Sequence, residues 1–411
     1  MSTPPVSVII VSRDRPDALD LCLTGVSQLD YPTYEVVVVA CAAGVAQVQA
    51  RADAALIKLV AFDDDNISVA RNLGVAQAAG EVVAFLDDDA VPEPTWLRHL
   101  AAPFDSADVA AAGGYVRGRN GVSYQWQART VDTRGDAVAL ALDGDAAQVL
   151  HPTKGRAIKT EGCNMALRRE VLADLGGFDP ALHFYLDETD LNMRLARAGY
   201  ATAIVPLAQV HHGYAASPRR AADRTPRDLT QIGASLAVYL RKHATVADHP
   251  AAWQKFRNAQ RQRLLRLMQR GPLGPDDVLR LLRGLDRGWR EGQNRDIGRI
   301  VPLPRAAEGL RAYPGRPRAR HMVLFGRPYG ASALRTQAQS EATADKIVTL
   351  FLLSPTTLWH HVRFHPDGYW EHTGGQFGRS DRQSRWRRIT SLRRRVDAEV
   401  ARLAGLRVLP N

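Results

Sequence analysis

The sequence has 411 residues, 45% of them hydrophobic and 24% charged, which excludes a disordered or fibrous chain and suits two or three globular domains. No segment reaches the ~18 uncharged apolar residues that a membrane-spanning helix needs. The first residues lack the basic start and the apolar run of a secretory signal peptide, so we expect neither feature.

The net charge of +11 is unevenly distributed along the chain. Residues 1–225 carry 20 basic and 28 acidic side chains, whereas residues 226–411 carry 34 and 15. The acidic part would bind nucleic acid poorly. The basic part could contact an anionic membrane surface, an anionic acceptor or RNA, or it could be an arginine-rich soluble region without such a partner. Of these partners we do not expect nucleic acid.

Three cysteines, Cys22, Cys41 and Cys163, are widely spaced and match no metal or redox motif. This usage is typical of a reducing compartment, where structural disulfides are rare. We therefore expect a cytoplasmic protein, either free or held peripherally on the inner face of the plasma membrane.

Strands and helices alternate through the first 90 residues. Apolar strands are predicted at residues 6–11, 36–39 and 56–61, with a helix at residues 17–28. This alternation predicts βαβ units and a parallel sheet. Because ligands of such sheets bind beyond the carboxyl ends of the strands, we expect the functional site there.

Residues 66–76 (NISVARNLGVA) have the spacing of a helix that packs on the sheet through small residues. Arg71 and Asn72 on it are hydrogen-bond donors that could meet a diphosphate or a ribose. The next apolar run, residues 82–86, predicts a strand buried on both faces. It leads directly into Asp87, Asp88 and Asp89.

Three adjacent carboxylates raise one another's pKa unless a cation or solvent relieves them. We therefore expect the strand to end at a cleft with at least two of the three aimed at Mg²⁺ or Mn²⁺, cations that prefer oxygen ligands. The alternative is an acidic turn without a metal. Residues 92–97 (PEPTWL) then begin another helix with proline at its start.

This succession resembles the family 2 glycosyltransferases of the GT-A fold. The resemblance rests on the A-R-N-x-G helix, the G-E-x-x-x-F-L-D-D-D strand and the helix that follows it. It implies a nucleotide-sugar donor and a D-x-D pair that holds a divalent metal on the diphosphate. By position the pair is Asp87 and Asp89, and Asp88 stays open because the triplet allows another register.

Residues 105–158 are less regular, with a strand predicted at residues 109–116. Tyr124 and Trp126 could line an acceptor path, although core packing or an interface is the more common role of such residues. Residues 161–169 (EGCNMALRR) before G-G-F-D resemble the family's G-x-N-x-A-x-R-R segment. Gly162 would let the backbone approach a ligand, and Asn164 could contact its hydroxyls; the alternative is a tight turn and a surface helix.

Asp187 and Glu188 begin a helix, where carboxylates favour the positive end of its dipole. They could be structural, with Asp187 as a cap and Asp190 paired with Arg194. The segment also resembles the family's E-D-x-D-L-x-x-R motif, whose second acidic residue is the general base. By position that residue is Glu188, and Asp187 stays open because the order of the pair differs here.

Residues 202–210 predict a strand that ends in His211 and His212. A neutral imidazole at this position could bind the metal or donate to phosphate, as a histidine often does in the family, or it could simply be exposed. Nothing in the sequence decides which histidine is the functional one. Together with the metal candidates Asp87 and Asp89, the donor-binding candidates are Ser12, Arg13, Asp14, Arg71, Asn72, Asp87, Asp88, Gly162 and Asn164.

The pattern changes after residue 225. Helices are predicted at residues 227–242, 253–268 and 278–289, then a proline- and arginine-rich linker at residues 302–320. Beyond it the expected elements are strands at 321–325 and 347–353, a helix at 334–345, a hairpin of 362–364 and 369–370, and a basic helix at 385–403. His360, His361, His365 and His372 match no zinc spacing, so we expect surface or turn roles for them.

The expected architecture is therefore a GT-A catalytic domain with a Rossmann-like, mostly parallel sheet (1–225), a basic helical region and linker (226–320), and a small α/β C-terminal region of unknown role (321–411). The resemblance implies metal-assisted, inverting transfer of a sugar to a hydroxyl of a glycan, lipid-linked or protein acceptor, here with a cell-surface polysaccharide as the favoured class. The family's D-D-G-S segment, which holds the base, is replaced by residues 39–44 (VACAAG), so Asp14 or residues 63–65 would have to substitute.

Two other functions are compatible with parts of the pattern. A sugar-nucleotide pyrophosphorylase would share the sheet, but it needs a glycine-rich phosphate loop after the first strand, and VSRDRP is not one. A non-catalytic protein that binds a nucleotide sugar or an anionic polymer would keep the scaffold without turnover. Metal-dependent hydrolysis of a nucleotide sugar would distinguish an enzyme from such a binder.

Overall fold

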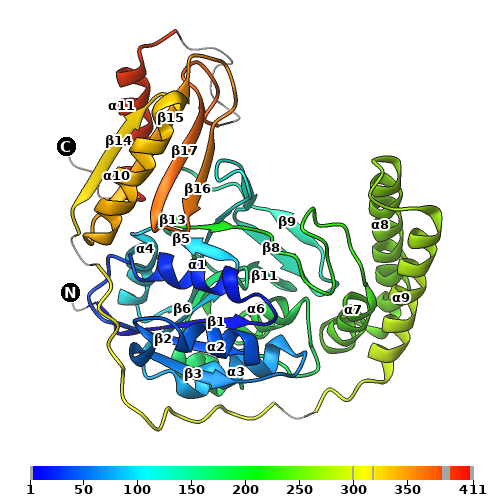
Figure 1. The fold of residues 1–411 in the computed structure, drawn as a ribbon. Helices are drawn as coiled ribbons and strands as arrows, with labels where there is room; N and C mark the ends of the chain where they lie inside the picture. Colours follow the sequence, from blue (N-terminus) through cyan, green and yellow to red (C-terminus); the bar gives the residue numbers. More distant parts are fainter. Residues whose placement is uncertain (1–2, 299, 317–318, 382–388, 408–411) are drawn as a thin grey trace.

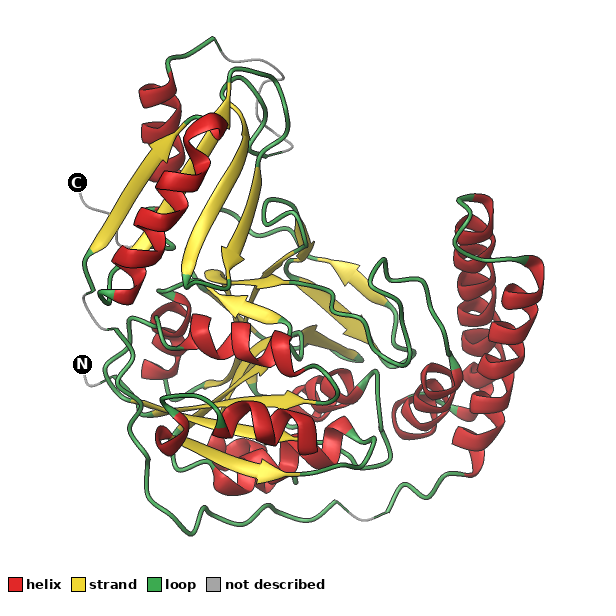
Figure 2. Cartoon of the chain, in the orientation of Figure 1, coloured by secondary structure: helices red, strands yellow, loops and turns green. Residues whose placement is uncertain are grey.

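The computed structural model describes residues 3–298, 300–316, 319–381 and 389–407. It has a large α/β domain, three helices on one side of it and a small α/β unit on the other (Figure 1). We call the described residues from 319 onward the C-terminal unit. A long connection without regular secondary structure runs along the large domain from the third of these helices to the C-terminal unit (Figure 2).

The main sheet is mixed but contains the predicted parallel strands. β1 is parallel to β2 and β4, β2 is parallel to β3, and β6 is parallel to β13, whereas β12 runs antiparallel between β4 and β6. Along the sheet the strands are β10 (Gln148–Leu150), β13 (Ala201–His212), β6 (Val109–Arg117), β12 (Asn164–Arg168), β4 (Val82–Asp87), β1 (Val6–Ser12), β2 (Tyr34–Ala40) and β3 (Ile57–Ala61). Short strands β5 (Ala90–Pro92) and β7 (Tyr124–Trp126) pair with β13 and β6.

Both faces of this sheet are covered, which explains the continuous apolar runs in its strands. In β2, Val36 and Val38 belong to the core on one face, and Val37 belongs to the core on the other. The first face is covered by α1 (Pro16–Val26), α2 (Ala42–Gln49) and α4 (Trp96–Ala101). The second is covered by α3 (Ile67–Gln77), α5 (Arg169–Asp174) and α6 (Asp187–Arg197).

A second, three-stranded sheet lies beside the carboxyl ends of the main strands. Its order is β11 (Arg156–Lys159), β8 (Arg129–Asp132) and β9 (Ala137–Ala139), with both pairs antiparallel. Val131 and Ala157 of this sheet share a core with residues of α6 and of the helix that follows β13. The less regular part of the sequence therefore forms a wall over the main sheet.

Three helices follow, α7 (Thr230–His243), α8 (His249–Gln269) and α9 (Pro275–Asn294). Tyr239 of α7 is buried in the core that includes Met193 of α6, and the rings of Trp253 and Trp289 stack with centroids 4.5 Å apart. α8 buries only Ala252 and Leu264 and is otherwise largely solvent-facing. No helix in the described parts of the chain combines the length and the apolarity needed to cross a membrane.

The predicted linker packs against the large domain rather than hanging free. Tyr313 is buried against Tyr34, with ring centroids 5.6 Å apart, and its amide donates to the Tyr34 carbonyl at 2.7 Å. The amide of Arg311 donates to the buried carboxylate of Glu35 at 2.9 Å. These contacts fix the connection along the start of β2; residues 317 and 318 of the predicted linker lie outside the described residues.

The C-terminal unit has the predicted α/β pattern. Its four strands are β14 (His321–Gly326), β15 (Ile347–Ser354), β17 (Tyr369–Gly375) and β16 (His361–His365), in that spatial order. α10 (Ala331–Thr343) covers one face and α11 (Leu392–Leu403) the other. Ser391 caps α11, so this helix begins later than the predicted residue 385; residues 382–388 lie outside the described residues.

The surface or turn roles predicted for the four histidines of this unit are wrong for two of them. His360 and His372 are 3% and 1% exposed, and His360 Nε2 lies 2.9 Å from His372 Nδ1. His361 is exposed and His365 is half-buried. The buried pair faces the large domain, because this unit docks on it.

Candidate active site

A cleft of 640 Å³ lies at the carboxyl ends of β1, β2 and β4, where a ligand is expected in such a sheet. Ser12 at the end of β1 and Asp87 at the end of β4 line one side of it. Lys159 of β11 and Glu188 of α6 also line it. Elements from four separate stretches of the sequence therefore meet around one space.

Asp87, Asp89 and His212 form a group that could hold a metal ion. Each offers one ligand atom, and these atoms lie within 4.8 Å of one another; among the described residues this is the only such group. His212 Nε2 lies 3.1 Å from Asp89 Oδ1 and 4.0 Å from Asp87 Oδ2. The other ring nitrogen faces Gln125 Oε1 at 2.9 Å, which orients the ring. Two carboxylates and an imidazole fit Mn²⁺ or Mg²⁺.

Asp89 lies in a strongly electropositive environment. Its carboxylate is 3.1 Å from Arg15 and 3.4 Å from Arg220, and it accepts the backbone amide of Ala215 at 2.8 Å. Burial alone would raise the pKa of Asp89, but the hydrogen bond from His212 and the charge of Arg15 hold it well below its usual range. Asp89 is therefore ionised and ready to bind a cation.

Asp88, a predicted donor-binding residue, points away from this group. It is fully buried, accepts the Ser12 hydroxyl at 2.8 Å and pairs with Arg15. Burial raises the pKa of Asp88 to about 7, against the opposing charge of Arg15. The middle carboxylate thus anchors the loop, while Asp87 and Asp89 share one side of it.

The two histidines at the end of β13 have different surroundings, because successive side chains of a strand point to opposite faces. His212 faces the cleft. His211 Nε2 instead bonds Glu93 Oε1 at 2.8 Å, and its ring lies 4.7 Å from that of Trp370 in the C-terminal unit. Burial lowers the pKa of His211. Of the two histidines predicted as metal ligands, the structure therefore brings only His212 together with Asp87 and Asp89, and His211 lies on the opposite face.

Asp187 and Glu188 are aimed at the cleft by an unusual backbone turn. Tyr185 and Leu186, just before them, have φ of 77° and 65°, in the left-handed region that side chains rarely adopt. Such strained conformations gather at functional sites. The turn starts α6 so that both carboxylates line the cleft in its first turn.

The two carboxylates have different partners and different charge states. Asp187 pairs with Arg71, and Glu188 Oε1 accepts from Lys159 Nζ at 2.9 Å. Burial raises the pKa of Asp187 to about 7, against the charge of Arg71. Burial would also raise the pKa of Glu188, but the Lys159 ammonium outweighs it and lowers this pKa to about 2. Glu188 is the carboxylate kept ionised.

Arg71 lies between the candidate metal site and the acidic pair. Besides Asp187, its guanidinium lies 3.4 Å from Asp87 Oδ1 and 3.2 Å from the Gly162 carbonyl oxygen. A Cβ on Gly162 would lie 2.5 Å from the Arg71 Nη2 atom, so no larger residue fits there without displacing the guanidinium. Gly162 therefore acts through Arg71, which explains why a glycine suits this position.

The amides of two further residues predicted to bind the donor, Asn72 and Asn164, form hydrogen bonds within the fold. Asn72 accepts the amide of Phe178 at 2.8 Å and donates to its carbonyl at 2.7 Å. Asn164 is fully buried; it accepts from Trp96 Nε1 at 2.7 Å and donates to two carbonyl oxygens at 2.9 Å. Neither side chain lines the cleft.

The turn after β1 contributes unequally to the cleft. Ser12 and Arg13 line it, and Arg13 pairs with Asp65 at 3.2 Å. Asp14, with φ of 57°, places its amide 3.2 Å from Cys41 Sγ and does not line the cleft. Of the acidic residues predicted to substitute in binding the base, Asp64 and Asp65 therefore lie beside the cleft and Asp14 does not.

Several cleft residues were missed from the sequence. Lys159, Arg129 and Tyr185 line the cleft, and so does Trp126, for which core packing had been the favoured role. Lys159 lies 29 residues before Glu188, so only the tertiary fold pairs them. The one available signal was the position of Lys159, two residues ahead of the E-G-C-N segment.

Residues 4–231, more than half of the chain, match the family model described as "Glycosyltransferase like family 2". The chain belongs to this family. The α/β architecture described above is accordingly the GT-A fold that was expected.

Curated relatives are similar to parts of the chain. The O-antigen biosynthesis protein RfbC of Myxococcus xanthus is 29% identical over 54% of this chain and 18% of its own length. A pre-mycofactocin glycosyltransferase of Mycobacterium tuberculosis is 30% identical over 36% of this chain and 30% of its own. Glycosyltransferase AglE of Haloferax volcanii is 26% identical over 43% of this chain and 56% of its own length. The chain thus spans less than two thirds of these relatives.

Solved structures are similar at lower identity. GalNAc-T7, crystallised with UDP, GalNAc and Mn²⁺, is 18% identical with a TM-score of 0.45, over 58% of this chain and 48% of that one. TarS of S. aureus is 17% identical with a TM-score of 0.40, over 62% of this chain and 43% of that one.

Proposed function

We propose that this glycosyltransferase moves a sugar from a nucleoside-diphosphate donor to a hydroxyl of a growing cell-surface polysaccharide, with inversion at the anomeric carbon. Residues 1–225 carry the chemistry. Asp87, Asp89 and His212 hold a divalent cation, and Glu188 is the general base. The residues that support this proposal come from β4, β13 and α6 and line or adjoin one cleft.

On the donor side, Asp87, Asp89 and His212 are the ligands. A divalent cation held by them would offset the negative charge that develops on the departing diphosphate. Arg71 and Arg13 add positive charge beside the same cleft. Val39 and Phe62 offer an apolar surface for the base, with Asp64 and Asp65 as the polar groups nearest in sequence.

On the acceptor side, Glu188 removes the proton of the attacking hydroxyl. The acceptor oxygen forms its bond to the anomeric carbon while its proton passes to the Glu188 carboxylate. The bond from the anomeric carbon to the diphosphate oxygen breaks, and its electron pair leaves with the nucleoside diphosphate. A single displacement of this kind inverts the anomeric configuration.

The observation that carries the proposal is that the carboxylates at the cleft have two different kinds of surroundings. One pair, Asp87 and Asp89, converges with an imidazole, whereas Glu188 is kept ionised by Lys159 and lies apart from that group. A binding protein without turnover has no need of a separate ionised carboxylate beside a metal site. The pattern therefore favours a catalyst over the non-catalytic alternative.

We also propose that the basic helices contact an anionic membrane surface, which would hold the enzyme near a lipid-linked acceptor. Arg283, Arg287 and Arg290 lie on one exposed face of α9. Within the described residues, neither Arg283 nor Arg290 has a carboxylate partner. Exposed cations without partners are the groups that an anionic surface attracts.

The proposal is tested by thermal-shift screening of UDP, GDP and dTDP sugars with Mn²⁺, since a bound donor raises the unfolding temperature. The sugar nucleotide that stabilises the chain is then supplied with glycan acceptors, and the product's anomeric configuration is read by NMR. Metal-dependent turnover with an inverted product is the expected result. Donor binding without any transfer or hydrolysis would favour the binding-protein alternative.

A further inference from the structure

The two metal-ligand candidates Asp89 and His212 lie on a very short piece of sheet. β5, which follows Asp89, pairs antiparallel with the end of β13 through three residue pairs, the last being Ala90 with His212. The Gly213 amide also donates to the Asp89 carbonyl at 2.7 Å. The distance between these ligands therefore depends on how well this three-residue ladder is held.

Glu93, the first residue after β5, ties the ladder together at its other end. Its backbone amide donates to the Gln209 carbonyl at 3.0 Å, and its side-chain Oε1 lies 2.8 Å from His211 Nε2. Glu93 is 1% exposed. Because His211 is the neighbour of His212, this bond also fixes the backbone beside the metal-ligand candidate.

A buried carboxylate at this position needs a cation, and the C-terminal unit supplies it. Arg407, which is 0% exposed, donates from Nε to Glu93 Oε2 at 2.7 Å and from Nη2 to Glu93 Oε1 at 2.8 Å. Glu93 and Arg407 are 314 residues apart in the sequence. Leaving one partner of such a buried pair alone is strongly unfavourable.

Further contacts hold Arg407 in place. Its guanidinium lies over the Trp370 ring at 4.2 Å and donates to Thr349 Oγ1 at 3.0 Å. The Thr95 hydroxyl, on the large domain, donates to the Leu406 carbonyl at 2.7 Å. The end of the described chain is thus locked between the two parts.

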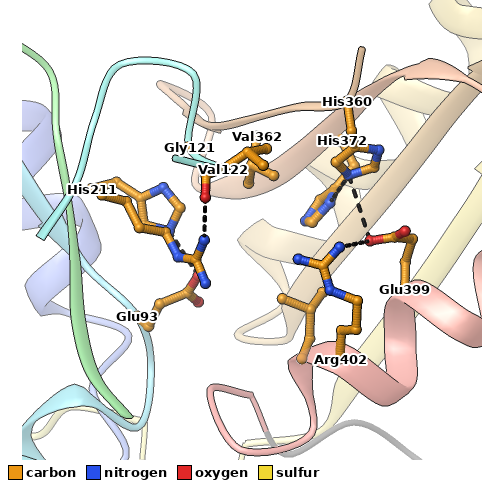
Figure 3. A pocket seen from close by; sticks show the side chains of 11 residues that line it. Glu93, Gly121, Val122, His211, His360, Val362, His372, Glu399 and Arg402 are labelled. Carbon is orange, nitrogen blue, oxygen red and sulfur yellow. Dashed lines mark hydrogen bonds and ion pairs between the residues drawn. The ribbon is translucent and has the colours of Figure 1, made fainter. Parts of the chain in front are cut away.

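The rest of the interface is closely packed around this pair. Figure 3 shows Glu93 and His211 facing His360, His372, Glu399 and Arg402 of the C-terminal unit. The space that these residues enclose is only 20 Å³. The C-terminal unit therefore docks on the strands that carry the metal-ligand candidates, with little free volume between them.

We propose that Arg407 is a positioning residue of the metal site, acting through Glu93 and His211 on the spacing of Asp89 and His212. The C-terminal unit is then a necessary part of the donor site. This inference rests on the proposed metal site, which involves none of the atoms of Arg407.

The test is calorimetric titration of the full chain with Mn²⁺, without donor or acceptor. Because Arg407 acts through Glu93 and the β5–β13 ladder rather than on a ligand directly, we expect Arg407→Met to weaken Mn²⁺ binding by about tenfold, the low end of the effect of losing a group that bonds a ligand. Arg407→Lys keeps the buried positive charge but loses the bidentate hydrogen bonds to Glu93, and it should weaken Mn²⁺ binding roughly threefold. Asp89→Asn should abolish binding.

The matched control is Lys58→Met. Lys58 and Glu35 form another buried pair, 3.0 Å apart, at the start of β2 and away from the cleft. This change should lower the unfolding temperature as much as Arg407→Met does while leaving the Mn²⁺ affinity unchanged. The inference about Arg407 would be overturned if both Arg407 variants bound Mn²⁺ with wild-type affinity, or if Lys58→Met lost as much Mn²⁺ affinity as Arg407→Met. Either result would leave the metal assignment standing. A wild-type chain that binds no Mn²⁺ would overturn the metal assignment as well.

Discussion

Lys159 Nζ donates to Glu188 Oε1 across 2.9 Å and so joins the end of β11 to the first turn of α6. The same ammonium lies 3.3 Å from Glu161 Oε2. Burial lowers the pKa of Lys159, but the carboxylates of Glu161 and Glu188 outweigh it and the pKa rises. The lysine thus stays charged and sets the charge state of the candidate base.

Lys159→Met should give the pH profile of transfer an acid limb. With Lys159 present, the pKa of Glu188 is about 2, so the base is ionised throughout the usual assay range. Without the ammonium, burial raises this pKa by roughly 2 units or more, and kcat/KM falls as the pH drops through the new value. The profile of Lys154→Met, which removes an exposed lysine, should match the wild type. Coincident profiles for all three proteins would contradict the role of Lys159.

Glu188→Gln should abolish sugar transfer and leave the affinity for the donor unchanged. The amide cannot accept the hydroxyl proton, so kcat should fall by about 10²–10⁴-fold. Asp187→Asn instead removes the carboxylate that pairs with Arg71 and should weaken donor binding more than it slows transfer. Initial rates and donor titrations of both variants separate the two effects. An active Glu188→Gln enzyme together with an inactive Asp187→Asn enzyme would assign the base to Asp187.

Gly162→Ala should impair catalysis by displacing Arg71. The new Cβ would lie 2.5 Å from the Arg71 guanidinium, which must then leave its position between Asp87 and Asp187. A displacement of a positioning group by about 1 Å can lower the rate on the order of 10²-fold. Gly330→Ala is the control, because a Cβ there meets no atom within 4 Å. Steady-state rates equal to the wild type for Gly162→Ala would rule out this role of Arg71.

Reversing the charge of Arg283, Arg287 and Arg290 to Glu should weaken binding to anionic vesicles. Each cation near such a surface contributes about 1 kcal/mol, so the triple variant should lose most of the affinity at low salt. Co-sedimentation with phosphatidylserine vesicles measures this, and turnover of a soluble acceptor should stay unchanged. A chain that sediments equally with neutral and anionic vesicles would refute the membrane contact.

The strands of the sheet could be predicted because the apolar pattern of each strand depends directly on whether its faces are buried. A run such as residues 82–86 has to be covered on both faces wherever it lies, and three carboxylates after it have to reach solvent or a cation. The helix start at Asp187 was similarly local. The helix predicted to start with proline in residues 92–97 begins only at Trp96, because Ala90–Pro92 form β5. The class of fold therefore followed from short patterns.

The choice among neighbouring side chains could not be predicted in the same way. Strand alternation separates His211 from His212, but which of them faces the cleft depends on β13's partner strands. The side chains of Asp88, Asn72 and Asn164 are turned away from the cleft by partners between 44 and 106 residues away in the chain. No local pattern carries that information.

Arg71 is shared by two carboxylates, Asp87 of the proposed metal site and Asp187 of the acidic pair. A substitution at either one changes the charge that the guanidinium presents to the other, so the effects of the two will not add. Natural variants that alter one of these positions are then expected to carry a compensating change at the other. The evolution of the proposed metal site and that of the acidic pair would accordingly be linked through a single side chain.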